Sequence, residues 1–223
     1  MSMPFYVSPE QQMTDRAEFA RKGISRGRSV VVLACEQGIV FVADNPSRSL
    51  RKVSELYDRI GFAAVGRYNE FEALRVAGIR QADLRGYSYD RSDVTARSLV
   101  GQYSQLLGGA FASAGKPYEV ELAVAELGDA PGDDVVFHIN YDGTITEHAS
   151  AVALGRNAER IMAVLEDTEP TADLRSAATR AREALVTDES EAPTLEVAVL
   201  DRTVERRRRF RRLGSDERQD WLT

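Results

Sequence analysis

Two residues near the start of the chain, Ser29 and Asp44, could take part in nucleophilic chemistry. Ser29 begins the apolar run SVVVLAC, Asp44 ends the run GIVFVAD, and the EQG between the runs is typical of a hairpin turn. The hairpin would place a hydroxyl and a carboxylate at the same end of two paired strands. Two interpretations follow: an active nucleophile supported by an acid, or the frame of a hydrolase site that has lost its chemistry.

Other catalytic and binding chemistries have little support in the residue pattern. The chain has only two histidines, His138 and His148, and its one cysteine, Cys35, lies in an apolar run that favours a core position. We therefore expect neither a metal site nor a disulfide. The sequence contains no Walker motif, no glycine-rich loop between a strand and a helix, and no G-x-S-x-G elbow, so we expect no cofactor.

Length and composition favour one large domain, or at most two small ones, in a reducing cytoplasm. The 223 residues are 43% hydrophobic, which is enough to bury a core without cross-links. A formal net charge of −6 argues against non-specific binding to nucleic acid. No apolar stretch is long enough to span a bilayer, and the N-terminus lacks the pattern of a secretion signal. We expect no membrane partner and a cytoplasmic location.

Several predicted elements precede and follow the hairpin. SPEQQMTDRAEFARKGI predicts an amphipathic helix that starts at a Ser8 cap, with Pro9 in its first turn. RKVSELYDR and IGFAAVG predict a second pair of strands. Two long helices follow, and the second is expected to be capped by Ser92 or Asp93.

The second half of the chain repeats this order. YEVELAVAEL, VVFHINYD and GTITEHASAVAL predict strands, and two helices follow, the second with Thr171 as its expected cap. TLEVAVLDR predicts a strong last strand, and the run ERRRRFRR at 205–212 is interpreted as a charged edge strand with ion pairs rather than a nucleic-acid site. Grouped strands that are apolar on both faces predict an α+β fold with two stacked sheets between two helical layers.

The sequence also resembles a known family. The order and spacing of SPEQ, AEFARKGISRGRSVVV, EQGIVFVADN, RKV and AAVGRYNEF are similar to those of the α-type subunits of the 20S proteasome, the actinobacterial form in particular. PSRSLRKVSELYDRIGFAA, GYSYDRSDVT, KPYEVELAVAE and PTLEVAVLD continue the resemblance, which extends from Ser8 to about Arg212. The family belongs to the N-terminal-nucleophile hydrolase superfamily.

The resemblance implies a four-layer αββα sandwich with an extra N-terminal helix. It also implies three segments. Residues 1–7 form a gate segment, and residues 213–223 form a C-terminal tail. Between them, residues 8–212 form the α-type domain, in which the helix at 8–23 packs across the sandwich.

Catalytic β subunits of this family use a threonine that self-cleavage after a glycine exposes as the first residue, and its free amine accepts the proton. The resemblance matches that glycine to Gly27, the nucleophile to Arg28, the supporting acid to Asp44 and the supporting lysine to Lys52. A guanidinium stays protonated at neutral pH and is no nucleophile. Gly27, Arg28 and Asp44 are therefore expected to be a vestigial active-site frame, Ser29 a strand residue, and no residue catalytic.

The resemblance implies a non-catalytic subunit of a threonine-type endopeptidase complex. Copies of the chain would form a heptameric ring that caps a ring of β subunits, controls the access of unfolded protein substrates, and docks the C-terminal tails of a hexameric ATPase activator. In this family the lysine at the position of Lys52 binds the terminal carboxylate of the activator in a pocket between adjacent subunits. Glu18, Gly66 and Pro9 match other positions near that pocket.

The expected gate departs from the pattern of other members. Residues 1–7, MSMPFYV, lack the Tyr-Asp-Arg cluster that organises the gate in archaeal and eukaryotic α subunits. The resemblance therefore leaves the gate to apolar residues converging on the ring axis, with Met3, Phe5 and Tyr6 as candidates. The family also implies that a small protein modifier marks the substrates.

Two other functions stay open at this point. The chain could be an amidohydrolase that processes itself before Arg28 or Ser29, or a stand-alone binding module that kept only the fold. Arg28 and the amphipathic helix ahead of Gly27 argue against self-processing. The docking lysine and the match across the helices argue against a stand-alone module.

Overall fold

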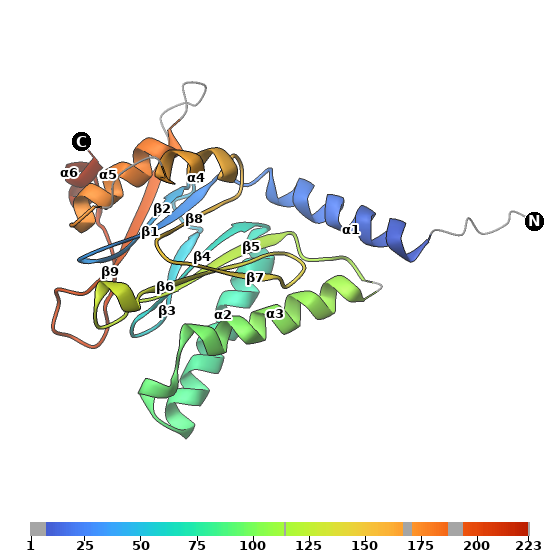
Figure 1. Cartoon of the computed structure of the whole chain (residues 1–223), viewed down its shortest axis with the longest axis horizontal. Helices are drawn as coiled ribbons and strands as arrows, with labels where there is room; N and C mark the ends of the chain where they lie inside the picture. Colours follow the sequence, from blue (N-terminus) through green and yellow to red (C-terminus); the bar gives the residue numbers. More distant parts are fainter. Residues whose placement is uncertain (1–7, 114, 167–170, 187–193, 223) are drawn as a thin grey trace, which may run out of the picture.

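The chain folds into two five-stranded antiparallel sheets stacked face to face, with helices on both outer faces (Figure 1). A computed structural model describes residues 8–113, 115–166, 171–186 and 194–222. One sheet has the strand order β10-β9-β2-β1-β8 and the other has the order β3-β4-β5-β6-β7. The predicted αββα sandwich with an N-terminal helix is confirmed.

The first sheet contains the hairpin identified in the sequence. Its strands are β1 (Val30–Cys35), β2 (Gly38–Asp44), β8 (Ala151–Leu154), β9 (Leu195–Asp201) and β10 (Phe210–Arg212). Its outer face is covered by α4 (Ala158–Glu166) and α5 (Leu174–Leu185), and α6 (Ser215–Leu222) packs against α5.

The second sheet carries the two long helices. Its strands are β3 (Val53–Tyr57), β4 (Ile60–Gly66), β5 (Val120–Glu126), β6 (Val135–Ile139) and β7 (Ile145–His148). α2 (Tyr68–Ser88) and α3 (Ala96–Ala112) pack on its outer face. Two short 3-10 helices, η1 (Arg91–Asp93) and η2 (Pro131–Asp133), lie in the connections.

Alternate residues of the inner strands β1, β2, β4, β5 and β9 face different apolar clusters, which explains why these strands read as continuous apolar runs. In β1, Val30 and Val32 face the cluster between the sheets, while Val31 and Leu33 face the cluster under α4 and α5. Phe41 is fully buried between the sheets, where a Cβ added to Gly61 of the opposite sheet would lie 2.4 Å from its ring. Gly61 therefore makes room for Phe41.

The N-terminal helix α1 (Pro9–Ile24) closes one end of the sandwich with its last turns only. Ser8 caps it by accepting a hydrogen bond from the Gln11 N–H at 3.2 Å, as predicted. Ala20 and Ile24 are buried in the cluster between the sheets. The Arg16 side chain donates to backbone carbonyls near the end of α3, and the N-terminal part of α1 projects from the body (Figure 1).

Two helix caps and one strand differ from the prediction. The Thr95 side chain caps α3, and the predicted caps Ser92 and Asp93 belong to η1 instead. Asp173, not Thr171, caps α5. In both places several residues able to cap lie within a few positions, so residue type alone does not select one. The segment predicted as one strand at 143–154 divides into β7 and β8, which belong to different sheets.

Phe41 provides the test of the core between the sheets. Phe41→Ala should lower the free energy of unfolding by about 3–5 kcal/mol, because the substitution leaves a cavity between two packed sheets. Chemical denaturation of the isolated chain measures this value. Tyr87→Ala is the control, since Tyr87 is 92% exposed and its truncation should change stability by less than about 0.5 kcal/mol. Equal effects of the two substitutions would contradict the described packing.

Candidate functional site

Arg28 and Asp44 meet at the end of the first hairpin. Arg28 lies just before β1, and its Nη1 donates to both carboxylate oxygens of Asp44 at 3.2 Å. The Arg28 side chain is 51% exposed and that of Asp44 is 19% exposed. A cation therefore lies at the position that the resemblance is expected to match to the nucleophile of catalytic β subunits.

Ser29 is buried and its hydroxyl is already engaged. Its Oγ donates a hydrogen bond to the backbone carbonyl of Arg156. Its own carbonyl accepts the Asp44 N–H at 3.0 Å, which continues the β1–β2 ladder by one residue. A buried hydroxyl bound to a carbonyl is poorly placed to attack a substrate.

Lys52 lies beside Arg28, on the segment that leads into β3. Its Nζ donates to the Arg28 carbonyl oxygen at 2.5 Å. Burial lowers the pKa of Lys52 to about 8; the Asp44 and Glu196 carboxylates oppose this shift and the Arg28 guanidinium adds to it. Within the described part of the chain, no carboxylate lies within ion-pair distance of Nζ, so the ammonium can donate two further hydrogen bonds.

Two glycines let the chain ahead of β1 lie against the end of β4. A Cβ on Gly27 would lie 2.5 Å from Val65 Cγ1 and 3.2 Å from the Gly66 nitrogen. Gly66 itself has a φ of +112°, and a Cβ there would lie 1.9 Å from the Glu119 carbonyl oxygen. The structure therefore brings Gly27, Arg28, Asp44, Lys52 and Gly66 together; we call this group the hairpin-end cluster.

Pro9 and Glu18 do not join the hairpin-end cluster of their own chain. Both are exposed on α1. With a rise of 1.5 Å per residue, Pro9 lies about 22 Å and Glu18 about 9 Å along the helix axis from Ile24, which precedes the cluster. A pocket that includes them together with Lys52 would need the α1 of an adjacent copy. The gate candidates Met3, Phe5 and Tyr6 lie outside the described residues.

The residue that holds the Lys52 segment in place, Glu196 of β9, was not identified from the sequence. Its carboxylate is 3% exposed and pairs with Arg212 at 3.2 Å. Its Oε2 accepts the Lys52 backbone N–H at 3.1 Å and the Asn45 side-chain amide at 2.7 Å. A glutamate inside the apolar run TLEVAVLD was the available signal, because a buried carboxylate requires partners.

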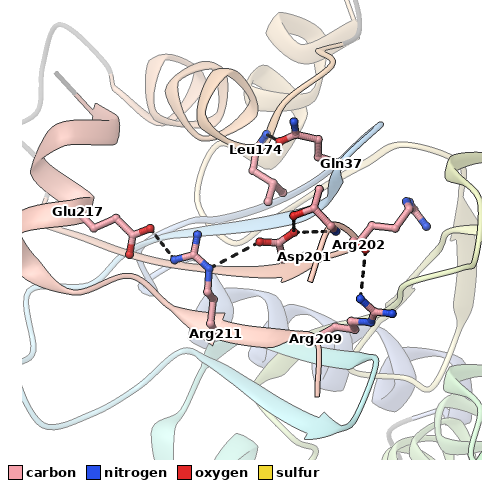
Figure 2. A network of polar contacts seen from close by, with 8 residues as sticks. Gln37, Leu174, Asp201, Arg202, Arg209, Arg211 and Glu217 are labelled. Carbon is pink, nitrogen blue, oxygen red and sulfur yellow. Dashed lines mark hydrogen bonds and ion pairs between the residues drawn. The ribbon is translucent and has the colours of Figure 1, made fainter. Parts of the chain in front are cut away.

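The arginine run at 205–212 is held by ion pairs, as predicted. β10 is an edge strand of the first sheet. Figure 2 shows Arg211 between Asp201, at 3.8 Å, and Glu217, at 2.6 Å. Arg209 donates to the Arg202 carbonyl oxygen at 3.2 Å in the same view. These contacts attach the last strand to β9 and α6.

Of the two histidines, His138 has a polar partner, whereas the buried His148 Nε2 has none among the described residues. His138 Nε2 lies 2.8 Å from Glu121 Oε1, and Glu121 also accepts the Gly155 N–H at 2.9 Å. Cys35 is buried. Across the described ranges, His, Cys, Asp and Glu side chains do not gather in threes as metal ligands would, and none of the helices there is long and apolar enough to cross a membrane.

The stacked sheets, the helical layers and the glycine ahead of β1 define an α+β sandwich of the N-terminal-nucleophile hydrolase type. A family profile described as Proteasome subunit matches residues 24–199, which is more than half of the chain. The chain therefore belongs to the proteasome subunit family.

Curated relatives agree with this family and with the α type. Proteasome subunit alpha of Jonesia denitrificans is 56% identical over 96% of this chain and 94% of that protein. Proteins with the same name from Arthrobacter sp. and Streptomyces coelicolor are 54% and 56% identical, over 97% and 96% of this chain and 96% and 87% of those proteins. The predicted resemblance to actinobacterial α-type subunits is confirmed.

Glu196 provides a test of how the site is held. Glu196→Gln should lower the free energy of unfolding by about 1.5–3 kcal/mol, because it removes the buried charge that Arg212 pairs with. Glu147→Gln is the matched control: its pair with Arg97 is exposed, so its loss should cost less than about 1 kcal/mol. Both values come from chemical denaturation, and an equal cost would mean that Glu196 does not anchor the segment.

Proposed function

We propose that the chain is a non-catalytic α-ring subunit of a 20S proteasome core. It forms the outer heptameric ring on a ring of threonine-type catalytic β subunits and controls the access of unfolded substrates in the cytoplasm. It also docks the C-terminal tails of a hexameric ATPase activator, in a pathway of modification-dependent protein degradation. The observation that carries the proposal is the Arg28–Asp44 ion pair at the head of β1.

The absence of catalysis follows from that ion pair and from the chain that precedes it. An N-terminal nucleophile needs a free amine at the strand start, and here a cleavage after Gly27 would be required to create one. The segment to be removed would be α1, which has a side-chain cap and buries Ala20 and Ile24 between the sheets. A segment built into the core is a poor propeptide. These features argue against the self-processed amidohydrolase.

Docking of activator tails uses the Lys52 ammonium. Its cation is half-buried, has no carboxylate partner within the described residues, and can still donate hydrogen bonds. A terminal carboxylate would supply the missing anion through a charge-assisted hydrogen bond worth about 1.5–3 kcal/mol. Gly66 completes one wall of the pocket. Glu18 and Pro9 contribute from the α1 of the adjacent copy, and several tails on one activator ring multiply the affinity.

Lys52→Gln tests docking most directly. In the assembly with β subunits, a synthetic peptide with a free C-terminal carboxylate should bind Lys52→Gln about tenfold to 100-fold more weakly, because a charge-assisted hydrogen bond is lost. The readout is the peptide concentration that half-maximally stimulates cleavage of a fluorogenic substrate.

Two controls accompany this measurement. Lys22→Gln removes an exposed lysine of α1 and should respond as the unaltered protein does. A peptide whose C-terminus is amidated should stimulate neither protein. An unchanged response of Lys52→Gln to the free carboxylate would contradict the docking role.

Deletion of residues 2–7 tests the gate. If Met3, Phe5 and Tyr6 close the pore at the ring axis, the deletion opens it and increases the rate of peptide cleavage by the α/β assembly several-fold. The control is a short peptide that enters without a gate, whose cleavage should change little. Equal cleavage rates before and after the deletion would remove the gate from the proposal.

A further inference from the structure

The chain has only three lysines, Lys22, Lys52 and Lys116, among 29 basic residues. The structure places them in three different environments. Lys22 is exposed in the last turn of α1. Lys116 Nζ pairs with Glu119 at 2.9 Å and also with Glu70, and although burial acts to lower the pKa of Lys116, these carboxylates raise it.

Lys52 differs from both because its amine is half-buried and has no carboxylate partner among the described residues. Its one observed hydrogen bond is to a backbone oxygen, that of Arg28. The nearby carboxylate of Asp44 pairs with the Arg28 guanidinium, and Glu196 accepts the backbone N–H of Lys52 instead of pairing with its Nζ. Nothing in the described residues holds this amine in its charged form through a direct ion pair.

We propose that Lys52 Nζ is an acylation site of this chain and that acyl phosphates are the class of donor it takes. The neutral amine attacks the acyl carbon, a C–N bond forms, and the C–O bond to the phosphate breaks. Inorganic phosphate leaves and the amine proton passes to solvent or to the phosphate. The product is a neutral amide on Lys52.

The amine meets the first requirement of this reaction, which is a neutral lone pair near neutral pH. An ordinary lysine, with a pKa of about 10.4, has a neutral fraction well below 1% at pH 7.5. Lys52, whose pKa burial lowers to about 8, is neutral in a large minority of molecules. The charged groups facing it act in both directions: Arg28 lowers the pKa, whereas Asp44 and Glu196 raise it.

The second requirement is a cation that holds the phosphate of the donor. Arg28 uses only its Nη1 to pair with Asp44, which leaves Nε and Nη2 without a hydrogen-bond partner among the described residues. Its side chain is 51% exposed. A guanidinium offers the planar donor geometry that suits a phosphate. The guanidinium of Arg28 belongs to the same residue whose backbone carbonyl accepts the hydrogen bond from Lys52 Nζ.

The consequence of acylation rests on the proposed function. An amide at Lys52 carries no charge and cannot form a charge-assisted hydrogen bond with the terminal carboxylate of an activator. Acylation would therefore reduce docking without altering the β subunits. The acylation chemistry itself does not depend on that role, so the two can be tested separately.

The first experiment incubates the full chain with acetyl phosphate at values from about pH 6.5 to about pH 9.5. Mass spectrometry of a proteolytic digest then quantifies acetylation at each of the three lysines. We expect Lys52 to be acetylated about tenfold faster than Lys22 at pH 7.5, with a rate that is half-maximal near pH 8 and reaches a plateau above about pH 9. In guanidinium chloride, which unfolds the chain, the acetylation rates of the three lysines should become similar. Acetylation of Lys22 as fast as Lys52 in the folded chain would overturn the proposal.

Arg28→Gln tests the donor class. Loss of the guanidinium should slow acetylation of Lys52 by acetyl phosphate at least about fivefold, because the phosphate anchor is lost and the pKa of Lys52 rises. Acetylation of Lys52 by N-acetoxysuccinimide, an uncharged acyl donor, should be slowed less, because only the change in the pKa of Lys52 affects it. The matched control Arg26→Gln removes an exposed arginine two residues away and should change neither rate. Equal slowing with both donors would overturn the assignment of acyl phosphates.

A third measurement separates this proposal from the proposed function. Acetylated protein is assembled with β subunits and titrated with the carboxylate peptide. Selective acetylation of Lys52 together with unchanged docking would leave the acylation site in place and contradict the docking role. If docking depends on Lys52 but Lys52 is not selectively acetylated, the docking role stands and the acylation site is contradicted.

Discussion

The ion pair between Arg28 and Asp44 is the interaction on which the character of this site depends. In the proposed function, it lies where a hydrolase of this fold needs a free amine and a nucleophile, and it places a permanent cation there. The chain can reach this position only because Gly27 lies directly against the end of β4. The preceding helix α1 packs against the sandwich through Ala20 and Ile24, which are buried in the core between the sheets. The helix α1 is thus part of the fold, and in the proposed function Gly27, Arg28 and Asp44 have a structural role only.

The same ion pair engages the carboxylate that lies near Lys52. With Asp44 engaged by Arg28, the Lys52 amine has a backbone carbonyl as its hydrogen-bond partner, and burial lowers its pKa to about 8. Glu196 keeps the Lys52 backbone in place through a buried network with Asn45 and Arg212. In the proposed function, the Lys52 cation pairs with the terminal carboxylate of an activator. When neutral, it is also a nucleophile.

Much of the fold could be predicted from the sequence, because the signals are local. The apolar strands, the EQG turn and the Ser8 cap each depend on a few neighbouring residues, and the structure has them where they were expected. The caps of α3 and α5 were wrong because Thr95 and Asp173 compete with equally suitable neighbours. Arg28, Asp44 and Lys52 could be placed by resemblance, but Glu196 could not, since its partners come from distant segments and no local pattern marks them. The relation of Pro9 and Glu18 to Lys52 depends on how copies of the chain meet, which no single sequence contains.

The central claim is that Arg28 never becomes a chain terminus, and the intact mass of the chain tests it most directly. The chain is incubated with its β subunit and denatured, and its intact mass is measured by mass spectrometry. A mass that includes α1 (Pro9–Ile24) agrees with the account, because α1 then stays part of the assembled protein. A chain that begins at Arg28 or Ser29 would contradict it, since the preceding segment would then be a propeptide and the chain a processed hydrolase.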